Sequence, residues 1–372
     1  MLKVLNQLKE YIKPKIVYDL EALENQMIFL NEAARINKTH LLFTIKSFPH
    51  EKIIELAAAH FDGFEVSNLS EYDLLSTKLG NKYLSINDPT CNIDDINIYL
   101  SNDVFLMINL DTFNTETAEL IKLYSQNPRM KFGLRVSHTA LNIDSSHYSN
   151  RISSSRFGER LENVIQFIKI HNVNVGIHIH NGSEENNKYT YSLMAKSVVD
   201  LLTKNSVNVN YINFGGGLHT ISNESIPGVF EAVRAVVPEN IQIFFEPGHV
   251  ICYQAGYAIA KIKSIKERRS NEYIVTTDIS YECNLKWSIP QYHTINQPDY
   301  EIPTEKTHDV DVIFYGSSCY ENDFIRNCKI DRNEFEQYIQ KERLIIFSNI
   351  NGYAYAWNHS FNGIPKADIY FV

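Results

Sequence analysis

The chain has 372 residues, of which 44% are hydrophobic and 21% charged, values ordinary for a globular protein with a large core. Its net charge of -9, without any Lys/Arg-rich block, argues against nucleic acid and anionic membranes as partners. No stretch reaches the roughly 18 apolar residues of a membrane span, and the N-terminus does not resemble a signal peptide. Scattered cysteines without zinc-type spacing favour a cytoplasmic enzyme with free thiols: Cys91, Cys252, Cys283, Cys319 and Cys328.

Eight apolar runs are predicted as strands, and helical patterns follow most of them. The strands are residues 40–45, 61–66, 83–86, 104–109, 131–136, 175–180, 209–214 and 241–246. The helices include residues 51–60, 70–79, 114–125, 161–171, 190–204 and 226–236. Such alternation predicts a parallel α/β sheet, and eight units in about 210 residues favour a (β/α)8 TIM-like barrel. An open doubly wound sheet is the alternative.

The pattern changes after residue 250. Aromatic, β-branched and polar residues alternate in residues 273–277, 310–315 and 343–347, and helical patterns become scarce. This predicts a mostly antiparallel β domain, which the segment Lys15-Ile16-Val17-Tyr18 is expected to join. The predicted organisation is therefore a barrel of residues 20–250 and a β domain of residues 1–19 and 251–372.

Lys46 stands at the end of the first predicted strand, directly after the apolar run Leu41-Leu42-Phe43-Thr44-Ile45. A buried strand has no use for a charge, and a lysine shielded from solvent is a nucleophilic amine that can form a Schiff base. Catalytic groups of a barrel gather at the carboxyl ends of its strands. Lys46 is therefore a candidate catalytic residue.

Other strand ends carry polar or glycine residues. They are Glu65 with Ser67 and Glu71, Arg135, His178 with His180, Gly215-Gly216-Gly217, and Glu246-Pro247-Gly248. Backbone without side chains lets several N–H groups converge on an anion, usually a phosphate. A glycine run alone is a flexible turn. With Ser183 on the neighbouring loop, the run becomes a candidate phosphate site.

Glu246 and His180 each allow two interpretations. Glu246 could be a solvated loop carboxylate, but the apolar run at residues 241–245 directs it inward, where it needs a cationic or N–H partner such as a protonated pyridine nitrogen. His180 could be a hydrogen-bonded core histidine or an imidazole stacked on a cofactor ring. Beside a lysine and a phosphate site, we favour the second interpretation of both residues.

A Schiff-base lysine, a phosphate site and a carboxylate for a ring nitrogen together predict pyridoxal 5'-phosphate (PLP) as cofactor. A nicotinamide dinucleotide is disfavoured because no GxGxxG follows an early strand. A metal site is the alternative, since His178 and His180 share one face of a strand. It lacks a third ligand and leaves Lys46 unexplained, so no metal is predicted.

In their order along the chain, these motifs resemble those of the fold-type III PLP decarboxylases, the ornithine, diaminopimelate and carboxynorspermidine decarboxylases, whose barrel is similar to that of alanine racemase. The matching segments in the barrel are Thr44-Ile45-Lys46-Ser47, Gly63-Phe64-Glu65-Val66-Ser67 with Glu71, Phe132-Gly133-Leu134-Arg135-Val136, Ser155-Arg156-Phe157-Gly158, Ile179-His180-Asn181-Gly182-Ser183, Phe214-Gly215-Gly216-Gly217-Leu218 and Glu246-Pro247-Gly248. The matching segments in the C-terminal part are Gly316-Ser317-Ser318-Cys319 with Asp323, Asn351-Gly352-Tyr353-Ala354 and Phe361-Asn362-Gly363.

The resemblance implies a role for each matching residue. Implied contacts of the cofactor are Lys46, Glu65, Arg135, His180, Ser183, Gly215, Gly216, Gly217, Glu246, Gly248 and Tyr353. Implied contacts of an amino-acid-like substrate are Asp278, Glu282, Tyr320 and Asp323. In this family the cysteine loop enters the partner subunit's site, so a homodimer with two shared active sites is implied. Cys319 would then protonate the α-carbon after carbon dioxide leaves, although a cytosolic cysteine is usually just a small buried hydrophobe.

The chain departs from the family pattern at two points. His249 replaces the common arginine after Glu-Pro-Gly, which alters one implied phosphate contact. Tyr320 replaces the acidic residue after the cysteine, with Glu321 displaced by one, which argues against ornithine and diaminopimelate. The stretch Asp278-Ile279-Ser280-Tyr281-Glu282 and the compact length are more similar to the carboxynorspermidine branch.

The expected activity is therefore decarboxylation of a carboxynorspermidine- or diaminopimelate-like amino acid. Three alternatives stay open. The first is decarboxylation of an amino-acid or aminocarboxypropyl group on a siderophore or peptide antibiotic precursor. The second is an amino-acid racemase, although racemases of this fold generally use a tyrosine where Cys319 is expected to act. The third is a non-catalytic regulatory homologue, which has no chemical reason to keep Lys46 and Glu246.

Overall fold

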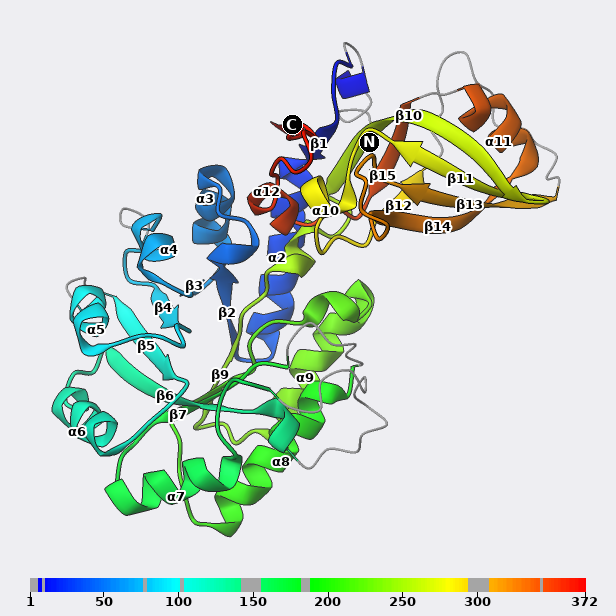
Figure 1. The fold of residues 1–372 in the computed structure, drawn as a ribbon. Helices are drawn as coiled ribbons and strands as arrows, with labels where there is room; N and C mark the ends of the chain where they lie inside the picture. The colour runs from blue at the N-terminus through cyan, green and yellow to red at the C-terminus, as the bar shows by residue number, and fades with distance from the viewer. Residues whose placement is uncertain are drawn as a thin grey trace. The chain divides into compact units, whose positions relative to one another are not determined.

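The computed structural model describes residues 6–8, 11–75, 79–100, 104–141, 155–181, 188–293, 308–341 and 344–372. The chain divides into two compact units (Figure 1), one formed by Met27–Val250 and the other by Met1–Gln26 together with Ile251–Val372. Within the described ranges, no helix is both long and apolar enough to cross a membrane.

The unit Met27–Val250 is a closed barrel of parallel strands, which confirms the predicted (β/α)8 barrel and excludes an open sheet. The strands are β2 (Thr39–Thr44), β3 (Gly63–Val66), β4 (Tyr83–Ile86), β5 (Phe105–Leu110), β6 (Met130–Val136), β7 (Gly176–Ile179), β8 (Tyr211–Asn213) and β9 (Gln242–Phe245). Each pairs with the next, and β2 pairs with β9 to close the barrel, with Leu41 opposite Phe245.

Helices lie around the outside of these strands (Figure 1). They are α2 (Leu20–Ile36), α3 (Glu51–His60), α4 (Leu69–Asp73), α5 (Ile93–Tyr99), α6 (Thr115–Tyr124), α7 (Leu161–His171), α8 (Thr190–Lys204) and α9 (Ile226–Val236). Sequence signals fix several ends: α7 stops where Asn172 takes a left-handed φ of 47°. The helix predicted at residues 70–79 is wrong in extent. The Leu75 amide bonds the Tyr72 carbonyl, which tightens the last turn and ends α4 early.

The interior of the barrel is packed by large side chains, because a parallel sheet covered by helices needs a dense core. Leu42, Met107, Tyr211 and Phe244 form one fully buried cluster. Tyr211 fits because β6 and β7 carry glycines beside it: a Cβ on Gly133 would lie 2.3 Å from its hydroxyl, and one on Gly176 2.3 Å from its ring. The phenol therefore reaches across the barrel toward the site described below.

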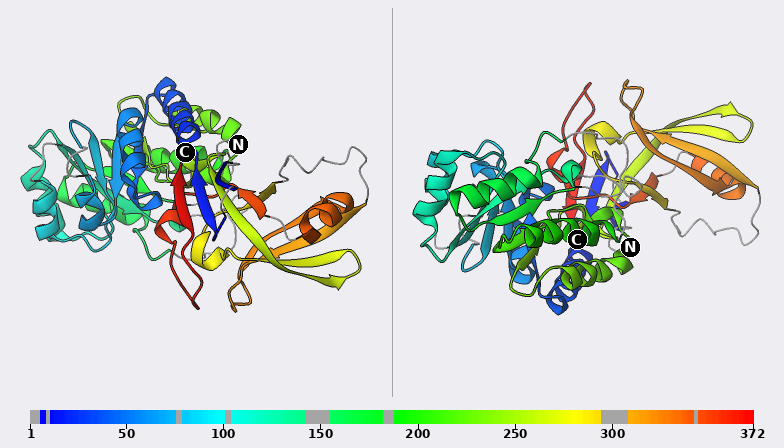
Figure 2. Two further views of the ribbon diagram at one scale, coloured as in Figure 1. Left: turned by 90° about the horizontal axis from the view of Figure 1, so that it is seen from above. Right: turned by 90° about the horizontal axis from the view of Figure 1, so that it is seen from below.

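The second unit contains an eight-stranded sheet with the path β12-β15-β10-β11-β13-β14 and, off it, β1 and β16 (Figure 2). The strands are β1 (Lys15–Tyr18), β10 (Gly256–Arg269), β11 (Glu272–Thr277), β12 (Gln291–His293), β13 (Asp309–Tyr315), β14 (Phe324–Asp331), β15 (Leu344–Ser348) and β16 (Asp368–Phe371). Of the described pairings, β1–β16 and β11–β13 are parallel and the rest antiparallel, as the mostly antiparallel prediction requires. The segment 15–18 joins this sheet through β10.

Short helices complete this unit: α10 (Tyr281–Asn284), α11 (Arg332–Gln337) and α12 (Tyr353–Ala356). The α11 helix packs on the sheet, where the rings of Phe335 and Tyr273 lie 4.2 Å apart. The N-terminal segment is attached to the same unit, because the Tyr11 hydroxyl donates to both carboxylate oxygens of Asp278 at 2.8 Å. Asp278 also accepts the Lys261 amide at 2.8 Å.

Candidate active site

Lys46 is predicted to stand at the end of a strand, but in the structure it lies in a turn that follows the strand. β2 stops at Thr44, and Ile45–Ser47 form a 3-10 turn in which the Phe48 amide bonds the Ile45 carbonyl at 3.0 Å. The Ser47 hydroxyl bonds the Thr44 carbonyl at 2.6 Å and holds the same turn. The turn moves the Lys46 amine off the strand and over the carboxyl end of the barrel.

A buried carboxylate receives this amine. Lys46 Nζ lies 2.6 and 2.5 Å from the two oxygens of Glu65, whose side chain is fully buried, and 2.9 Å from Ser67 Oγ. The Lys46 side chain itself is 39% exposed, so a ligand can reach its amine. Such a contact with a carboxylate favours the charged amine and also provides a place for the proton that a nucleophilic lysine must lose.

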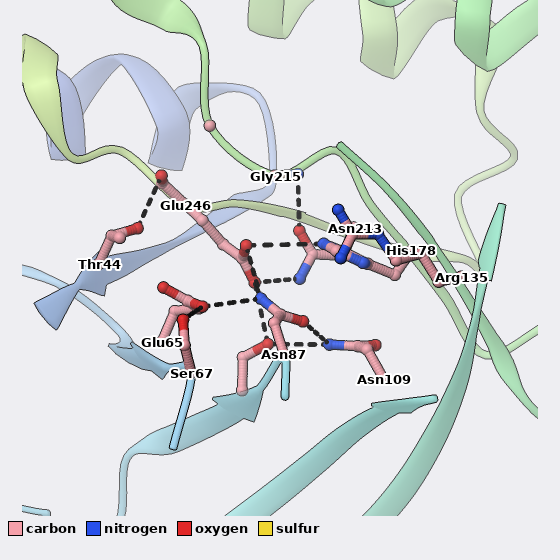
Figure 3. A network of polar contacts seen from close by, with 12 residues as sticks. Thr44, Glu65, Ser67, Asn87, Asn109, Arg135, His178, Asn213, Gly215 and Glu246 are labelled. Carbon is pink, nitrogen blue, oxygen red and sulfur yellow. Dashed lines mark hydrogen bonds and ion pairs between the residues drawn. The ribbon is translucent and has the colours of Figure 1, made fainter. Parts of the chain in front are cut away.

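Glu246 lies at the centre of a second group of buried polar residues (Figure 3). Its Oε1 accepts hydrogen bonds from Ser85 Oγ at 2.9 Å, Asn87 Nδ2 at 2.9 Å and Asn213 Nδ2 at 2.7 Å. From the described residues its Oε2 accepts one bond, from Asn87 Nδ2 at 2.9 Å. His178 Nε2 is 3.7 Å from Oε2, which is an ion-pair distance and too long for a hydrogen bond.

These neighbours keep Glu246 ionised. Burial alone would raise the pKa of its carboxyl, but the nearby His178 imidazole, the Lys46 charge and the Asn87 amide outweigh burial and lower the pKa well below its ordinary value. A buried carboxylate that stays negative requires a positive or N–H partner. Both ring nitrogens of His178 are also buried without a hydrogen-bond partner among the described residues. This arrangement fits a ligand whose protonated ring nitrogen would lie beside Glu246 Oε2.

The glycine run after β8 has the backbone that the sequence suggested. Gly215 and Gly217 have positive φ values of 62° and 92°, which residues with a Cβ rarely adopt. A Cβ on Gly215 would also lie 2.7 Å from the ring of His180. Tyr191 fixes the run from behind by donating to the Gly216 carbonyl at 2.6 Å. The run therefore forms a tight turn, in which the Gly215 amide donates to Asn213 Oδ1 at 2.9 Å, and it lies against the imidazole of His180.

His180 directly follows β7, the strand that pairs with β8, and Arg135 lies on β6, which pairs with β7. Burial, followed by the positive charge of Arg135, lowers the pKa of His180, so its ring is neutral at neutral pH. A neutral flat ring is suited to stacking on another ring. Arg135 Nη1 lies 3.6 Å from Asp111 Oδ1, and its guanidinium lies over the ring of Phe157 at 4.4 Å. Ser183, the predicted phosphate contact, lies outside the described residues.

Gly248, the last predicted residue of the barrel unit, lies against the turn that carries Lys46, since a Cβ on it would meet Ser47 Cβ at 2.8 Å. The other remaining predicted residues belong to the second unit. Cys319 and Tyr320 are exposed in the loop after β13, and the Asn362 amide donates to Cys319 Sγ. Glu282 on α10 pairs with Lys286, which lies just beyond the end of that helix. Tyr353 opens α12 with its ring edge-on to Trp287 at 5.0 Å.

Asp323 and Asp278, both predicted to contact substrate, have their described contacts inside the protein. Asp323 is 1% exposed and accepts from Ser280 Oγ at 3.0 Å, the Glu282 amide at 3.2 Å and the Ser318 amide at 3.1 Å. It therefore ties the cysteine loop to the start of α10. Asp278 holds Tyr11, and burial raises the pKa of its carboxyl.

Four residues of the site were missed in the sequence: Ser85, Asn87, Asn109 and Asn213. Asn87 follows β4, Asn109 lies near the end of β5, and Asn213 ends β8. They stand at strand ends, where polar residues of a barrel gather, so the rule that singled out Lys46 and Glu246 applies to them as well. Across the described ranges, no three His, Cys, Asp or Glu side chains group as metal ligands would.

Comparison with known proteins gives matches of three kinds. Residues 20–260 match the family described as pyridoxal-dependent decarboxylase, pyridoxal binding domain. Diaminopimelate decarboxylase of Aquifex aeolicus is 27% identical over 180 residues, a match that spans 46% of this chain and 40% of that relative. The fold is similar to lysine/ornithine decarboxylase of Vibrio vulnificus, with a TM-score of 0.72, 17% identity, and coverage of 100% and 98% of the two chains. It is also similar to carboxynorspermidine decarboxylase of Campylobacter jejuni, with a TM-score of 0.67, 18% identity, and coverage of 97% and 94%.

Proposed function

The chain belongs to the pyridoxal-dependent decarboxylases, whose cofactor is PLP, and we propose that it decarboxylates a substituted α-amino acid. The membership confirms the resemblance stated from the sequence. One observation carries the proposal: an accessible lysine, Lys46, meets one buried carboxylate, Glu65, while a second, Glu246, stays ionised close by. PLP needs a primary amine for its aldehyde and an anion for its ring nitrogen, and the site holds both.

The proposed roles follow from these contacts. Lys46 holds the cofactor through its amine, and Glu65 and Ser67 orient Nζ and carry its proton. Glu246 binds the ring N–H, His180 packs on the ring face, and Gly215 to Gly217 surround the phosphate. When bound, PLP supplies the electron-withdrawing ring that stabilises the negative charge left by departing carbon dioxide. The ionised Glu246 strengthens that withdrawal because it keeps the ring nitrogen protonated.

Protonation of the substrate carbon is assigned to Cys319 of a partner subunit in a homodimer. Cys319 is exposed in its own unit, which also carries further large exposed apolar side chains. These are Trp287, Ile289, Tyr320, Phe324, Trp357 and Phe361, each between 39% and 51% exposed. Exposed apolar groups of this size usually mark an interface. A second copy of the chain is the occupant that would place Cys319 in a barrel site.

The substrate is proposed to be carboxynorspermidine- or diaminopimelate-like, handled in the cytoplasm. The acidic residue expected after the cysteine is absent, since Tyr320 occupies that position and is 48% exposed. Asp323 does not replace it, because its carboxylate is used within the loop. A distal amine would have to be bound by Glu282, Glu321 or another group. A tailoring role on a siderophore or peptide precursor stays the alternative.

Two experiments test this function. The first is absorbance of bound cofactor in the visible range, which is expected in the purified protein and lost in Lys46→Ala. The second is carbon dioxide release across diamino acids, carboxynorspermidine and aminocarboxypropyl compounds. A protein that binds PLP and exchanges the α-hydrogen without releasing carbon dioxide would be a racemase instead. One that binds PLP with no turnover on any of them would contradict an enzymatic role.

Mixing two inactive variants tests the shared site. Lys46→Ala lacks the cofactor lysine and Cys319→Ala lacks the proposed acid, so each homodimer is inactive. Random exchange makes half of the dimers mixed, and each mixed dimer has one intact site of two, which restores about a quarter of the wild-type sites. Recovery of activity on mixing supports the homodimer with shared sites. No recovery, after subunit exchange is shown by mass, contradicts it.

A further inference from the structure

Asn87 is the one described side chain that contacts both carboxylates of the site (Figure 3). Its Nδ2 lies 2.9 Å from each oxygen of Glu246 and 3.2 Å from Glu65 Oε1. An amide nitrogen carries two hydrogens, so one N–H is shared by the two Glu246 oxygens and the other serves Glu65. The planar amide of Asn87 therefore links Glu246, the residue proposed to bind the ring nitrogen, to Glu65, the residue that contacts Lys46.

The orientation of this amide is fixed from behind. Its Oδ1 accepts from Asn109 Nδ2 at 2.8 Å, and Asn109 Oδ1 in turn accepts from the Tyr211 hydroxyl at 2.7 Å. Ionised carboxylates only accept hydrogen bonds, so Asn87 must turn its nitrogen toward them. Tyr211 is held by the barrel core, where glycines of two strands leave room for its ring. Asn87 is therefore preorganised before any ligand binds.

The same contacts distinguish the two oxygens of Glu246. Oε1 accepts hydrogen bonds from Ser85 and Asn213 and shares the N–H of Asn87 with Oε2. These bonds use the acceptor capacity of Oε1. Among the described residues, Oε2 receives as a hydrogen bond only the share of Asn87, and His178 Nε2 lies 3.7 Å from it, beyond hydrogen-bond distance. The ligand's N–H is therefore expected at Oε2, in a direction set by Asn87.

We propose that Asn87 is a positioning residue that aims Glu246 Oε2 at the ring nitrogen of PLP and, through Glu65, sets the proton affinity of the Lys46 amine. This inference rests on the role of Glu246 proposed above. Binding of the ring nitrogen and protonation of the lysine linkage should therefore both change when this one side chain is altered. A residue that merely filled space would affect neither response.

Ser85 provides the matched control. It is also buried beside Glu246 and donates to Oε1 at 2.9 Å. Its hydroxyl accepts from Asn109 Nδ2 at 3.0 Å, but Asn109 keeps its own bond to Asn87 Oδ1 without it, and no side-chain hydrogen bond described for Ser85 reaches Glu65 or Lys46. Ser85→Ala is thus expected to weaken the ring-nitrogen end alone. Asn87→Ala is expected to change both ends. If Asn87→Ala fails to fold by circular dichroism, Asn87→Leu keeps a similar shape, removes the donor without adding a charge and should act in the same direction.

The first measurement compares the affinity of the apoprotein for PLP and for the analogue in which carbon replaces the ring nitrogen. A hydrogen bond to a charged group corresponds to a preference of about tenfold to hundredfold for PLP in the wild type. In Asn87→Ala this preference is expected to fall by threefold or more. In Glu246→Gln it should nearly vanish.

The second measurement is the pH midpoint of the absorbance change of the lysine-bound cofactor. Removing the Asn87 N–H leaves Glu65 less neutralised, so the proton on the Lys46 nitrogen is held more tightly and the midpoint moves to higher pH. Ser85→Ala should leave the midpoint in place. Unchanged preference and midpoint in both Asn87 variants would overturn the inference alone. Equal preference in wild type and Glu246→Gln would overturn the proposed role of Glu246, and the inference with it.

Discussion

The imidazole rings of His219 and His249 lie face to face, with centroids 4.2 Å apart and planes within 2° of parallel. His219 lies just after the glycine run and His249 just after Glu246-Pro247-Gly248. The pair therefore joins the two loops that flank the candidate phosphate site. It stands where the family resemblance implies an arginine.

His249→Arg is expected to strengthen PLP binding. A guanidinium adds a permanent charge and a forked donor for phosphate, and it stacks on flat rings such as that of His219. One charge-assisted hydrogen bond corresponds to about a tenfold decrease in the dissociation constant. Equilibrium dialysis of PLP against apoprotein measures this dissociation constant in the wild type and the variant. Pyridoxal, which lacks the phosphate, is the control ligand and should bind both proteins equally; a gain for pyridoxal too would contradict a phosphate contact.

The histidine pair also predicts loss of stability in mild acid. Burial, with the charge of His219, lowers the pKa of His249 from 6.5 to about 3, and burial lowers that of His219 as well. Between these values the unfolded chain binds protons that the folded protein refuses, so the free energy of unfolding falls as pH drops below about 6.5. In His249→Asn, the shift of the urea midpoint between pH 7 and pH 5 should be smaller than in the wild type. An equal shift would assign the acid sensitivity to other groups.

Gly215→Ala is expected to reduce cofactor binding by an order of magnitude or more. The new Cβ would meet the ring of His180 at 2.7 Å, and φ of 62° is unfavourable for alanine. Gly228→Ala is the matched control, since it lies within α9 and its Cβ would meet nothing within 4 Å. There alanine should stabilise the fold by about 0.5–1 kcal/mol and leave PLP affinity unchanged. Equal effects at both positions would contradict the close approach.

Asp323→Asn should loosen the cysteine loop without altering PLP affinity. Asp323 now accepts hydrogen bonds from Ser280, Glu282 and Ser318. The NH2 group of an asparagine would face one of these three donors and could not accept its hydrogen bond. Leaving one of them unpaired costs about 1–3 kcal/mol. Thermal unfolding measures the loss, and alkylation of the exposed Cys319 reports whether its loop has moved. Normal stability would show that the loop does not depend on Asp323.

The sequence predicts much of the candidate site in the barrel because apolar runs indicate where each strand ends, and candidate catalytic residues stand at those ends. Lys46, Glu65 and Glu246 were found in this way, although the turn after β2 was not. Asn87 and Asn109 follow the same rule, but an asparagine at a strand end is also typical of an ordinary turn, so it carries little signal by itself. Only the fold shows that the amide of Asn87 faces two carboxylates, those of Glu65 and Glu246, which are 22 and 159 residues away in the chain.

The β unit was less predictable. β10 begins as a buried strand, but its second half, Lys-Ser-Ile-Lys-Glu-Arg-Arg, is mostly exposed and charged, so its pattern is that of a loop. Cross-strand pairing with β11 makes this second half a strand, while β15 pairs with the first half, and pairing between distant segments leaves little trace in local sequence. Asp323 shows the same limit. Its motif resembles a substrate contact, while its burial and partners depend on a neighbouring helix.

The contact between Thr44 and Glu246 makes cofactor binding a reporter of folding. Thr44 Oγ1 donates to the Glu246 carbonyl at 3.0 Å, so the residue two before Lys46 is fastened to the residue proposed for the ring nitrogen where β2 meets β9. Those strands open and close the barrel, and 202 residues separate the two partners. A nascent or partly unfolded chain thus has the lysine without the carboxylate beside it. PLP should bind only after the last strand has docked, and its binding energy then stabilises the closed barrel in proportion to the logarithm of cofactor concentration, linking the lifetime of the enzyme to its vitamin supply.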